Sequence, residues 1–299
     1  MGTMNDSVRH LTLADGRRLE ILAGKPTAGR TLLFHGGTPT APAPFRPLDD
    51  AAAARGIRVV QYARPGYAGS DRHPGRSVAD CAADVAAILD ELGVERCLTL
   101  GWSGGGPHAL ATAALLPDRV AAAATIAGVA PYPAEGLDWL AGMGAENVEE
   151  FGAALAGPEP LAAFLEHAAA GLAGITAEDV SAALGDLVSD EDRAALTGEF
   201  AAWTATAFRR AVSSGIWGWH DDDVAFTRPW GFALASIRVP VSVWQGEHDR
   251  MVPFAHGEWL AAHVPGVRAH LLADHGHLSI GVASLERILD DLLERADAG

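Results

Sequence analysis

The sequence predicts an α/β protein with a mostly parallel sheet that is covered by helices on both faces. Short apolar runs alternate along the chain with longer, Ala-rich stretches of helical character. A Gly-x-Ser-x-Gly segment, Gly101 to Gly105, joins one such run to a helical stretch, and acid and histidine candidates follow two later runs. Parallel strands end at one edge of their sheet, so these polar groups are expected to meet there.

The first part of the chain alternates strands and helices in this way. A hairpin is expected around the turn residues Asp15-Gly16. A long helix is expected to begin at the cap candidate Ser77 and to end at Gly93. The expected strands are 8–13, 17–23, 31–34, 57–62, the run that begins at Leu98 and an Ala-rich run that ends near Gly128, and the expected helices are 48–54, 77–93 and a stretch that ends at Leu116.

The middle of the chain has a different character. Residues 131–229 contain no convincing strand, but they contain helical runs at 147–155, 160–172, 177–188 and 190–212. We interpret this segment as a helical cap inserted after the sixth strand into a core domain of residues 1–130 and 230–299. A cap above a nucleophile selects the acyl group that fits. The apolar candidates for lining its pocket are Trp139, Met143, Phe151, Trp203, Phe208, Trp217 and Trp219.

An acidic run, Asp221-Asp222-Asp223, lies near the end of this segment. Adjacent carboxylates repel one another and favour solvent. We expect a solvated turn here, with binding of a cationic substrate as the alternative.

Ser103 has the sequence context of a nucleophile. The strand-like run Leu98-Thr99-Leu100 precedes it, and a helical stretch follows. At such a strand-to-helix turn the serine adopts a strained backbone conformation, and Gly101 and Gly105 allow the strand and the helix to approach. The turn also directs the N–H of Gly104 at a carbonyl oxygen that gains negative charge.

A serine nucleophile needs a base and an acid. A β-branched run at 239–245 leads into a polar turn with Asp249, and a further run at 267–272 leads into a turn with His277. We predict Asp249 as the acid and His277 as the base, with His275 as the alternative base. The histidines and acids of this region match no compact metal-ligand spacing, so no metal is expected.

These motifs together resemble those of the α/β-hydrolase superfamily over most of the chain outside the cap. The segment His35-Gly36-Gly37-Thr38-Pro39 resembles the family's His-Gly oxyanion loop, and Arg64 to Ser70 resembles its Arg-x-Gly-x-Gly-x-Ser loop. The resemblance implies an α/β-hydrolase fold with an eight-stranded sheet and an inserted helical cap. The oxyanion hole would then consist of the N–H of Gly104 and that of Thr38 or Gly37.

The same resemblance implies a reaction. The protein would cleave a carboxylic ester, lactone or thioester of a small to medium apolar substrate through an acyl-enzyme, and it would need no cofactor. Trp102 and His35 would contact this small-molecule substrate. The alternatives are other triad chemistry on the same fold (C–C bond hydrolysis, aminopeptidase action or cofactor-free haloperoxidation) and a non-catalytic ligand-binding role. A serine in place of an aspartate at position 103 disfavours the dehalogenase and epoxide-hydrolase branches.

Composition favours a protein that acts on a small molecule. The 299 residues are 49% hydrophobic and 20% charged, which is enough to bury a large core. The formal net charge of −16 disfavours a nucleic-acid partner, which needs clustered Lys and Arg. No segment has the pattern of a signal peptide or a bilayer span, so we expect a cytoplasmic monomer or homodimer that does not bind membranes. Cys81 and Cys97 are expected to be reduced, buried thiols.

Overall fold

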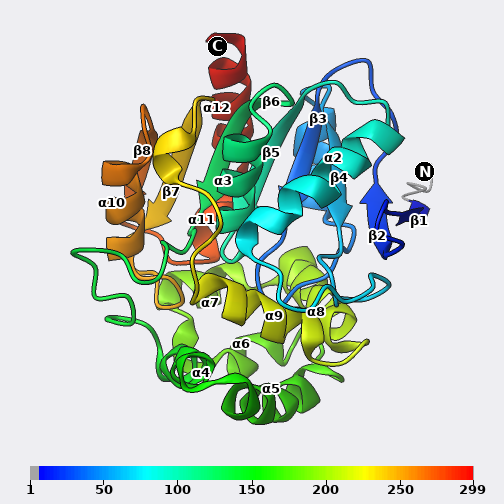
Figure 1. Cartoon of the computed structure of the whole chain (residues 1–299). Coiled ribbons are helices and arrows are strands. Elements are labelled where there is room, and N and C mark those ends of the chain that lie inside the picture. Colours follow the sequence, from blue (N-terminus) through cyan, green and yellow to red (C-terminus); the bar gives the residue numbers. More distant parts are fainter. Residues whose placement is uncertain (1–6, 299) are drawn as a thin grey trace.

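The computed structural model describes residues 7–298 (Figure 1). A sheet forms the middle layer, and helices cover both of its faces. A further group of helices lies together across one edge of the sheet, below it in Figure 1. The predicted α/β architecture is therefore confirmed. Residues 1–6 and 299 of the predicted core domain lie outside the described residues.

The sheet has eight strands in the order β1-β2-β4-β3-β5-β6-β7-β8. β2 pairs antiparallel with β1 and β4, and all other neighbours pair in parallel. The register places His35, the last residue of β3, beside Gly101 of β5, so the segment that follows (residues 36–40, the β3 loop) leaves the sheet next to Ser103. The strands are β1 (Ser7–Thr12), β2 (Arg18–Ala23), β3 (Thr31–His35), β4 (Arg58–Tyr62), β5 (Cys97–Trp102), β6 (Val120–Ile126), β7 (Val241–Gly246) and β8 (Arg268–Leu272).

Two groups of buried apolar side chains hold the covering helices to the sheet. One includes Leu33, Leu110 and Leu260 and lies under α2, α3 and α10. The other includes Leu32 and Leu48 and lies on the opposite face, under α1, α11 and α12. Leu32 and Leu33 are neighbours in β3 and point to opposite faces, which explains why the central strands are apolar throughout. These helices are α1 (Arg46–Ala53), α2 (Cys81–Glu91), α3 (Gly105–Leu115), α10 (Phe254–His263), α11 (Ser279–Ala283) and α12 (Leu285–Ala298).

Helices α4 to α9 follow β6 in the chain and precede β7, as the prediction of an insertion after the sixth strand requires. Their boundaries differ from the predicted ones in three places. The run 177–188 is reduced to the four residues of α6 (Val180–Ala183) and a 3-10 turn at Gly185–Leu187. The run 190–212 is broken by extended backbone at Thr197, and α9 was not predicted as a helix. The helices are α4 (Ala145–Ala156), α5 (Pro158–Leu172), α6 (Val180–Ala183), α7 (Asp190–Ala195), α8 (Gly198–Val212) and α9 (Trp217–Phe226).

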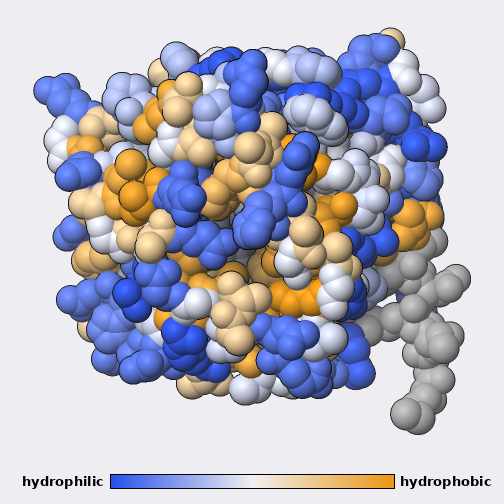
Figure 2. Space-filling model, turned by 90° about the horizontal axis from the view of Figure 1, so that it is seen from below, coloured by the Kyte–Doolittle hydropathy of each residue, from blue (hydrophilic) through white to orange (hydrophobic). Residues whose placement is uncertain are grey.

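The outer face of this helical group is mixed in character. Figure 2 views it from below and shows apolar residues in small groups among charged ones. Val148, Leu155 and Trp217 are the exposed large apolar residues that α4 and α9 contribute. Within residues 7–298 no helix combines the length and the apolar character needed to cross a lipid bilayer.

Both cysteines lie in the core. Cys81 begins α2 and Cys97 begins β5. Both are free and buried, as predicted, and burial raises the pKa of each thiol to about 12. Neither thiol is therefore a reactive thiolate at neutral pH.

Candidate active site

Ser103 lies on the turn between β5 and α3. Its φ of 55° lies in the left-handed region, which serine rarely adopts. The N–H of Gly106 donates to the Ser103 carbonyl at 2.8 Å and closes the turn. A Cβ at Gly101 would overlap the Gly105 carbonyl, and a Cβ at Gly105 would overlap the His35 carbonyl. The two glycines therefore allow the close approach of strand and helix that the motif predicted.

His277 and Asp249 are hydrogen-bonded to each other. The Nδ1–H of His277 donates to Asp249 Oδ2 at 2.8 Å and to Oδ1 at 3.0 Å. Asp249 also accepts from the backbone N–H groups of Met251 and Val252 and from the side chain of Gln245. This arrangement fixes the imidazole with its proton on Nδ1, so that Nε2 is available as an acceptor.

Burial and charge act in opposite directions on this pair. Burial raises the pKa of Asp249, although the nearby His277 partly offsets the rise. Burial alone would lower the pKa of His277, but the Asp249 carboxylate outweighs it, and the pKa of His277 lies above its ordinary value of 6.5. The imidazole is therefore a stronger base than a free histidine.

The backbone around His277 is held by Asp192 of α7, a residue that no sequence motif indicated. Its carboxylate is fully buried and accepts hydrogen bonds from three successive backbone N–H groups, those of His277, Leu278 and Ser279, at 2.8–2.9 Å. The indole N–H of Trp102 donates to the His277 carbonyl at 3.1 Å. Both peptide groups that adjoin His277 are thus fixed by side chains.

The β3 loop passes directly beside the turn that carries Ser103 (the Ser103 turn). A side chain at Gly37 would bring its Cβ within 3.3 Å of the Ser103 Cβ. The guanidinium of Arg64 donates to the carbonyls of Gly36 (2.6 Å) and Gly37 (3.0 Å). In a trans peptide the N–H points opposite to the carbonyl, so the N–H groups of Gly37 and Thr38 point away from Arg64. Both predicted candidates for the second oxyanion donor therefore share one orientation.

Arg64 is held in turn by Asp222 of α9. The fully buried carboxylate of Asp222 accepts from Arg64 (2.6 Å), Arg76 (2.7 Å), the Tyr67 hydroxyl (2.9 Å) and the Thr38 hydroxyl (2.8 Å). Burial alone would raise the pKa of Asp222, but the two arginines outweigh it and hold the pKa far below its ordinary value. Asp222 is thus an ionised group that joins α9 to the β3 loop.

The prediction of a solvated turn at Asp221-Asp222-Asp223 is wrong. All three residues lie in α9 and are at most 3% exposed. Successive helical residues are roughly 100° apart around the axis, so the three carboxylates face different groups. Asp221 pairs with Arg72 (2.8 Å), Asp222 binds the two arginines described above, and Asp223 faces a cavity. Their partners are distant in the sequence, so the local charge pattern did not indicate burial.

His35 lies beneath the β3 loop. It is buried, with Nδ1 3.2 Å from the Tyr62 hydroxyl and Nε2 3.1 Å from the Thr99 hydroxyl. Burial lowers its pKa well below the ordinary value, so the ring is neutral. His35 does not line the cavity, and the predicted contact between His35 and substrate is corrected to a supporting position between β3, β4 and β5.

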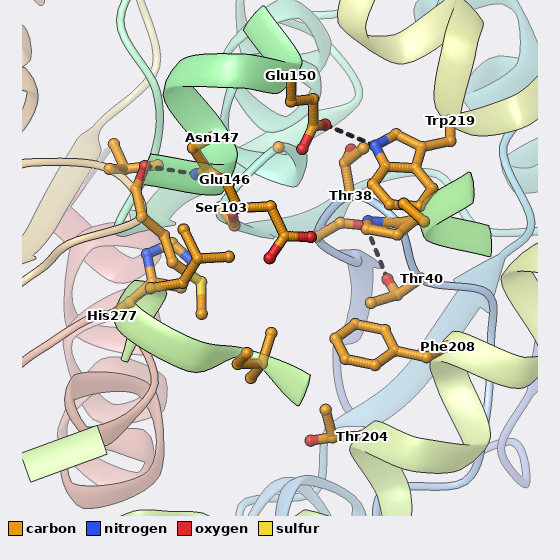
Figure 3. Close-up of a pocket in the computed structure, with 18 of the residues that line it drawn as sticks. Thr38, Thr40, Ser103, Glu146, Asn147, Glu150, Thr204, Phe208, Trp219 and His277 are labelled. Atoms are coloured by element: carbon orange, nitrogen blue, oxygen red, sulfur yellow. Dashed lines mark hydrogen bonds between the residues drawn. The ribbon is translucent and has the colours of Figure 1, made fainter. Parts of the chain in front are cut away.

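A cavity of about 410 Å³ is lined by the β3 loop, the Ser103 turn and helices from α4 to α9 (Figure 3). Ser103, His277, Gly37, Thr38 and Gly104 all line it. The cavity has the size of a small-molecule site. Most of its wall is apolar, and the predicted lining residues found there are Trp102, Met143, Phe151, Trp203, Phe208 and Trp219.

Two predicted lining residues lie elsewhere. Trp139 packs in the core against Phe151 and His256, and its indole N–H donates to the Ala130 carbonyl. Trp217 is 42% exposed, and the guanidinium of Arg72 covers its ring. Helical spacing of aromatic residues therefore does not distinguish a pocket from a core.

One end of the cavity is acidic. Glu150 and Asp223 line this end, Glu146 also lines the cavity, and no Lys or Arg side chain in residues 7–298 does so. Figure 3 shows the indole N–H of Trp219 donating to Glu150, at 2.7 Å. Burial raises the pKa of Glu150 to about 7, and it raises the pKa of Asp223 well above its ordinary value. In the described part of the chain, no His, Cys, Asp and Glu side chains form a group of three or more that would hold a metal ion.

We predict that Asp222→Asn lowers the free energy of unfolding by about 3–5 kcal/mol, because it leaves two buried guanidinium groups without a counter-charge. Urea unfolding followed by circular dichroism measures this. The matched control is Asp290→Asn, which breaks the exposed pair with Arg55 and should cost less than about 1 kcal/mol. Equal losses of unfolding free energy in the two variants would contradict the view that Asp222 is the buried counter-charge of the two arginines.

Comparison with known proteins identifies the family of this fold. The family described as alpha/beta hydrolase fold matches residues 30–283. A 2-hydroxy-6-oxononadienedioate/2-hydroxy-6-oxononatrienedioate hydrolase of Paraburkholderia phymatum is 27% identical over 92% of this chain and 93% of its own length. A pimeloyl-[acyl-carrier protein] methyl ester esterase of Aromatoleum aromaticum is 31% identical over 74% and 81%. The structure of an alpha/beta hydrolase fold protein from Nakamurella multipartita is 26% identical over 97% and 100%, with a TM-score of 0.65. The chain therefore belongs to the α/β-hydrolase fold family, and it is an enzyme of the hydrolase class.

Proposed function

We propose that the protein is a serine hydrolase that cleaves a carboxylic ester, lactone or thioester of small to medium size. The observation that carries this proposal is that Ser103 and His277 line one largely apolar cavity, while His277 is hydrogen-bonded behind it to Asp249. Asp249 bonds to His277, which favours His277 over His275 as the base. An esterase also occurs among the relatives at 31% identity.

In this proposal Ser103 Oγ attacks the carbonyl carbon while its proton moves to Nε2 of His277. The carbonyl oxygen becomes an oxyanion, which the N–H of Gly104 and that of Thr38 or Gly37 stabilise. Collapse of this intermediate breaks the bond to the leaving group, which takes the proton from His277. Water then loses a proton to the same imidazole and attacks the acyl-enzyme, and the acid and the free Ser103 hydroxyl are released.

Helices α4 to α9 act as the cap in this proposal. They supply much of the wall that faces Ser103, including Phe151, Trp203 and Trp219, so they determine which acyl group fits. Residues 131–229 are accordingly the selective part and residues 1–130 and 230–299 the catalytic part. No cofactor enters this reaction.

The charge of the cavity favours an ester over the dianionic substrate named for the Paraburkholderia phymatum relative. Two carboxylate groups of a substrate need cationic partners when they leave water. In residues 7–298 the cavity instead carries Glu146, Glu150 and Asp223 and no Lys or Arg. An apolar acyl group meets no such penalty along the aromatic wall.

The first test is hydrolysis of p-nitrophenyl esters from acetate to decanoate. Ser103→Ala and His277→Ala should each lower kcat by at least about 10³-fold, because the nucleophile and its base act as a unit. His275→Ala is the matched control and should retain activity. The wild type should show an optimum of chain length set by the cavity. Absence of both esterase activity and fluorophosphonate labelling of Ser103 in the wild type would contradict the proposal and favour a non-catalytic receptor.

The pH profile gives a second test. His277 must be neutral to accept a proton, so kcat/KM for a neutral ester should rise with pH through the pKa of His277. Because Asp249 raises that pKa, the midpoint of the rise should lie above pH 6.5. Glu150 titrates in the same range, so the profile is also measured for Glu150→Gln, in which the rise should remain. A midpoint below 6.5 would contradict the role assigned to the Asp249–His277 pair.

A further inference from the structure

The acidic end of the cavity contains a carboxyl pair with too few donors. Glu150 of α4 and Asp223 of α9 are 7% and 0% exposed, and their carboxyl groups lie within hydrogen-bonding reach of each other. The indole N–H of Trp219 donates to Glu150. In the described chain no N–H or hydroxyl group donates to either carboxylate oxygen of Asp223. A buried carboxylate in this state is costly unless a proton or a ligand supplies the missing donors.

The neighbouring residue Asp222 is a buried carboxylate of α9 whose hydrogen bonds are all supplied by the protein. Asp222 accepts from two arginines and two hydroxyl groups. Asp223, the next residue, is turned toward the cavity and faces Glu150 instead. The donors available to Asp222 do not reach Asp223, so its partner has to come from the cavity.

The Glu150–Asp223 pair favours a positively charged partner. Burial raises the pKa of both carboxyl groups, so the pair by itself tends to retain a proton between them. One proton supplies one donor, whereas a primary ammonium supplies three N–H donors and a positive charge. Glu146, on the same helix as Glu150, adds a further carboxylate to the cavity wall. An anion at this position would be repelled.

We propose that Glu150 and Asp223 bind the ammonium group of an amine-bearing substrate whose ester carbonyl lies at Ser103. This inference rests on the proposed hydrolase function and specifies its substrate class. The aromatic side chains that line the cavity would hold the apolar body of the substrate. Figure 3 shows Ser103 and His277 on one side of the cavity, with Glu150 and Trp219 together at its upper end.

The test compares pairs of p-nitrophenyl esters that differ in one group. ω-Aminoalkanoyl esters of four to eight carbons are each paired with the alkanoyl ester in which a methyl group replaces the ammonium. In the wild type, kcat/KM of at least one amino ester should exceed that of its methyl partner by at least about tenfold. In Glu150→Gln and Asp223→Asn this ratio should fall by at least about tenfold, mainly through KM.

Glu149→Gln is the matched control. Glu149 lies on the same helix and carries the same charge, but it is exposed and does not line the cavity. In Glu149→Gln the ratio of kcat/KM between each amino ester and its methyl partner should equal that of the wild type. A wild-type ratio of one or less for every pair, or a ratio that neither variant changes, would overturn the proposal and leave the pair as a structural acid pair.

Calorimetric titration of the wild type with hexylamine and with hexanol separates this inference from the proposed function. Tighter binding of hexylamine, lost in Asp223→Asn, supports the ammonium site even if no ester is hydrolysed. Hydrolysis of neutral esters together with equal binding of the two ligands would overturn the ammonium site and leave the hydrolase proposal intact.

Discussion

Two buried carboxylates from the helical segment, Asp192 and Asp222, hold the loops on which the proposed chemistry depends. A carboxylate removed from water must be paired or fully hydrogen-bonded, so each fixes its partners in space. Asp192 binds three backbone N–H groups of the His277 turn, and Asp222 binds Arg64, which orients the carbonyls of the β3 loop. The helices between β6 and β7 thus complete the site as well as cover it.

This constraint joins the helices between β6 and β7 to the loops at the ends of the strands. The sheet alone places Ser103, Asp249 and His277 at the ends of their strands. The direction of the N–H groups of Gly37 and Thr38, however, follows from the carbonyl contacts of Arg64, which depend on a residue of α9. A change at Asp222, which does not line the cavity, is therefore expected to reach the N–H groups of Gly37 and Thr38 through Arg64.

Sequence patterns were sufficient for the features that depend on local spacing. Alternating strands and helices, the glycines around Ser103 and the insertion after β6 could all be predicted because each depends on neighbouring residues. Asp192, Asp222 and Asp223 could not, because their partners lie as many as 184 residues away in the chain. The predicted solvated turn followed from the repulsion of three adjacent charges, which α9 avoids by directing them to different partners. The split between α7 and α8 was missed because the apolar pattern continues across the break at Thr197.

The role of the buried carboxylates is tested most directly by the rate at which a fluorophosphonate modifies Ser103 in Asp192→Ala. Removal of this carboxylate leaves three backbone N–H groups of the His277 turn without an acceptor, while Ser103, His277 and Asp249 remain. We predict a rate at least about tenfold below that of the wild type in a protein whose circular dichroism shows it to be folded. Asp190→Ala, an exposed acid on the same helix, should react like the wild type. An unchanged rate in Asp192→Ala would show that the sheet alone orients His277 and would contradict the central role of the buried carboxylates.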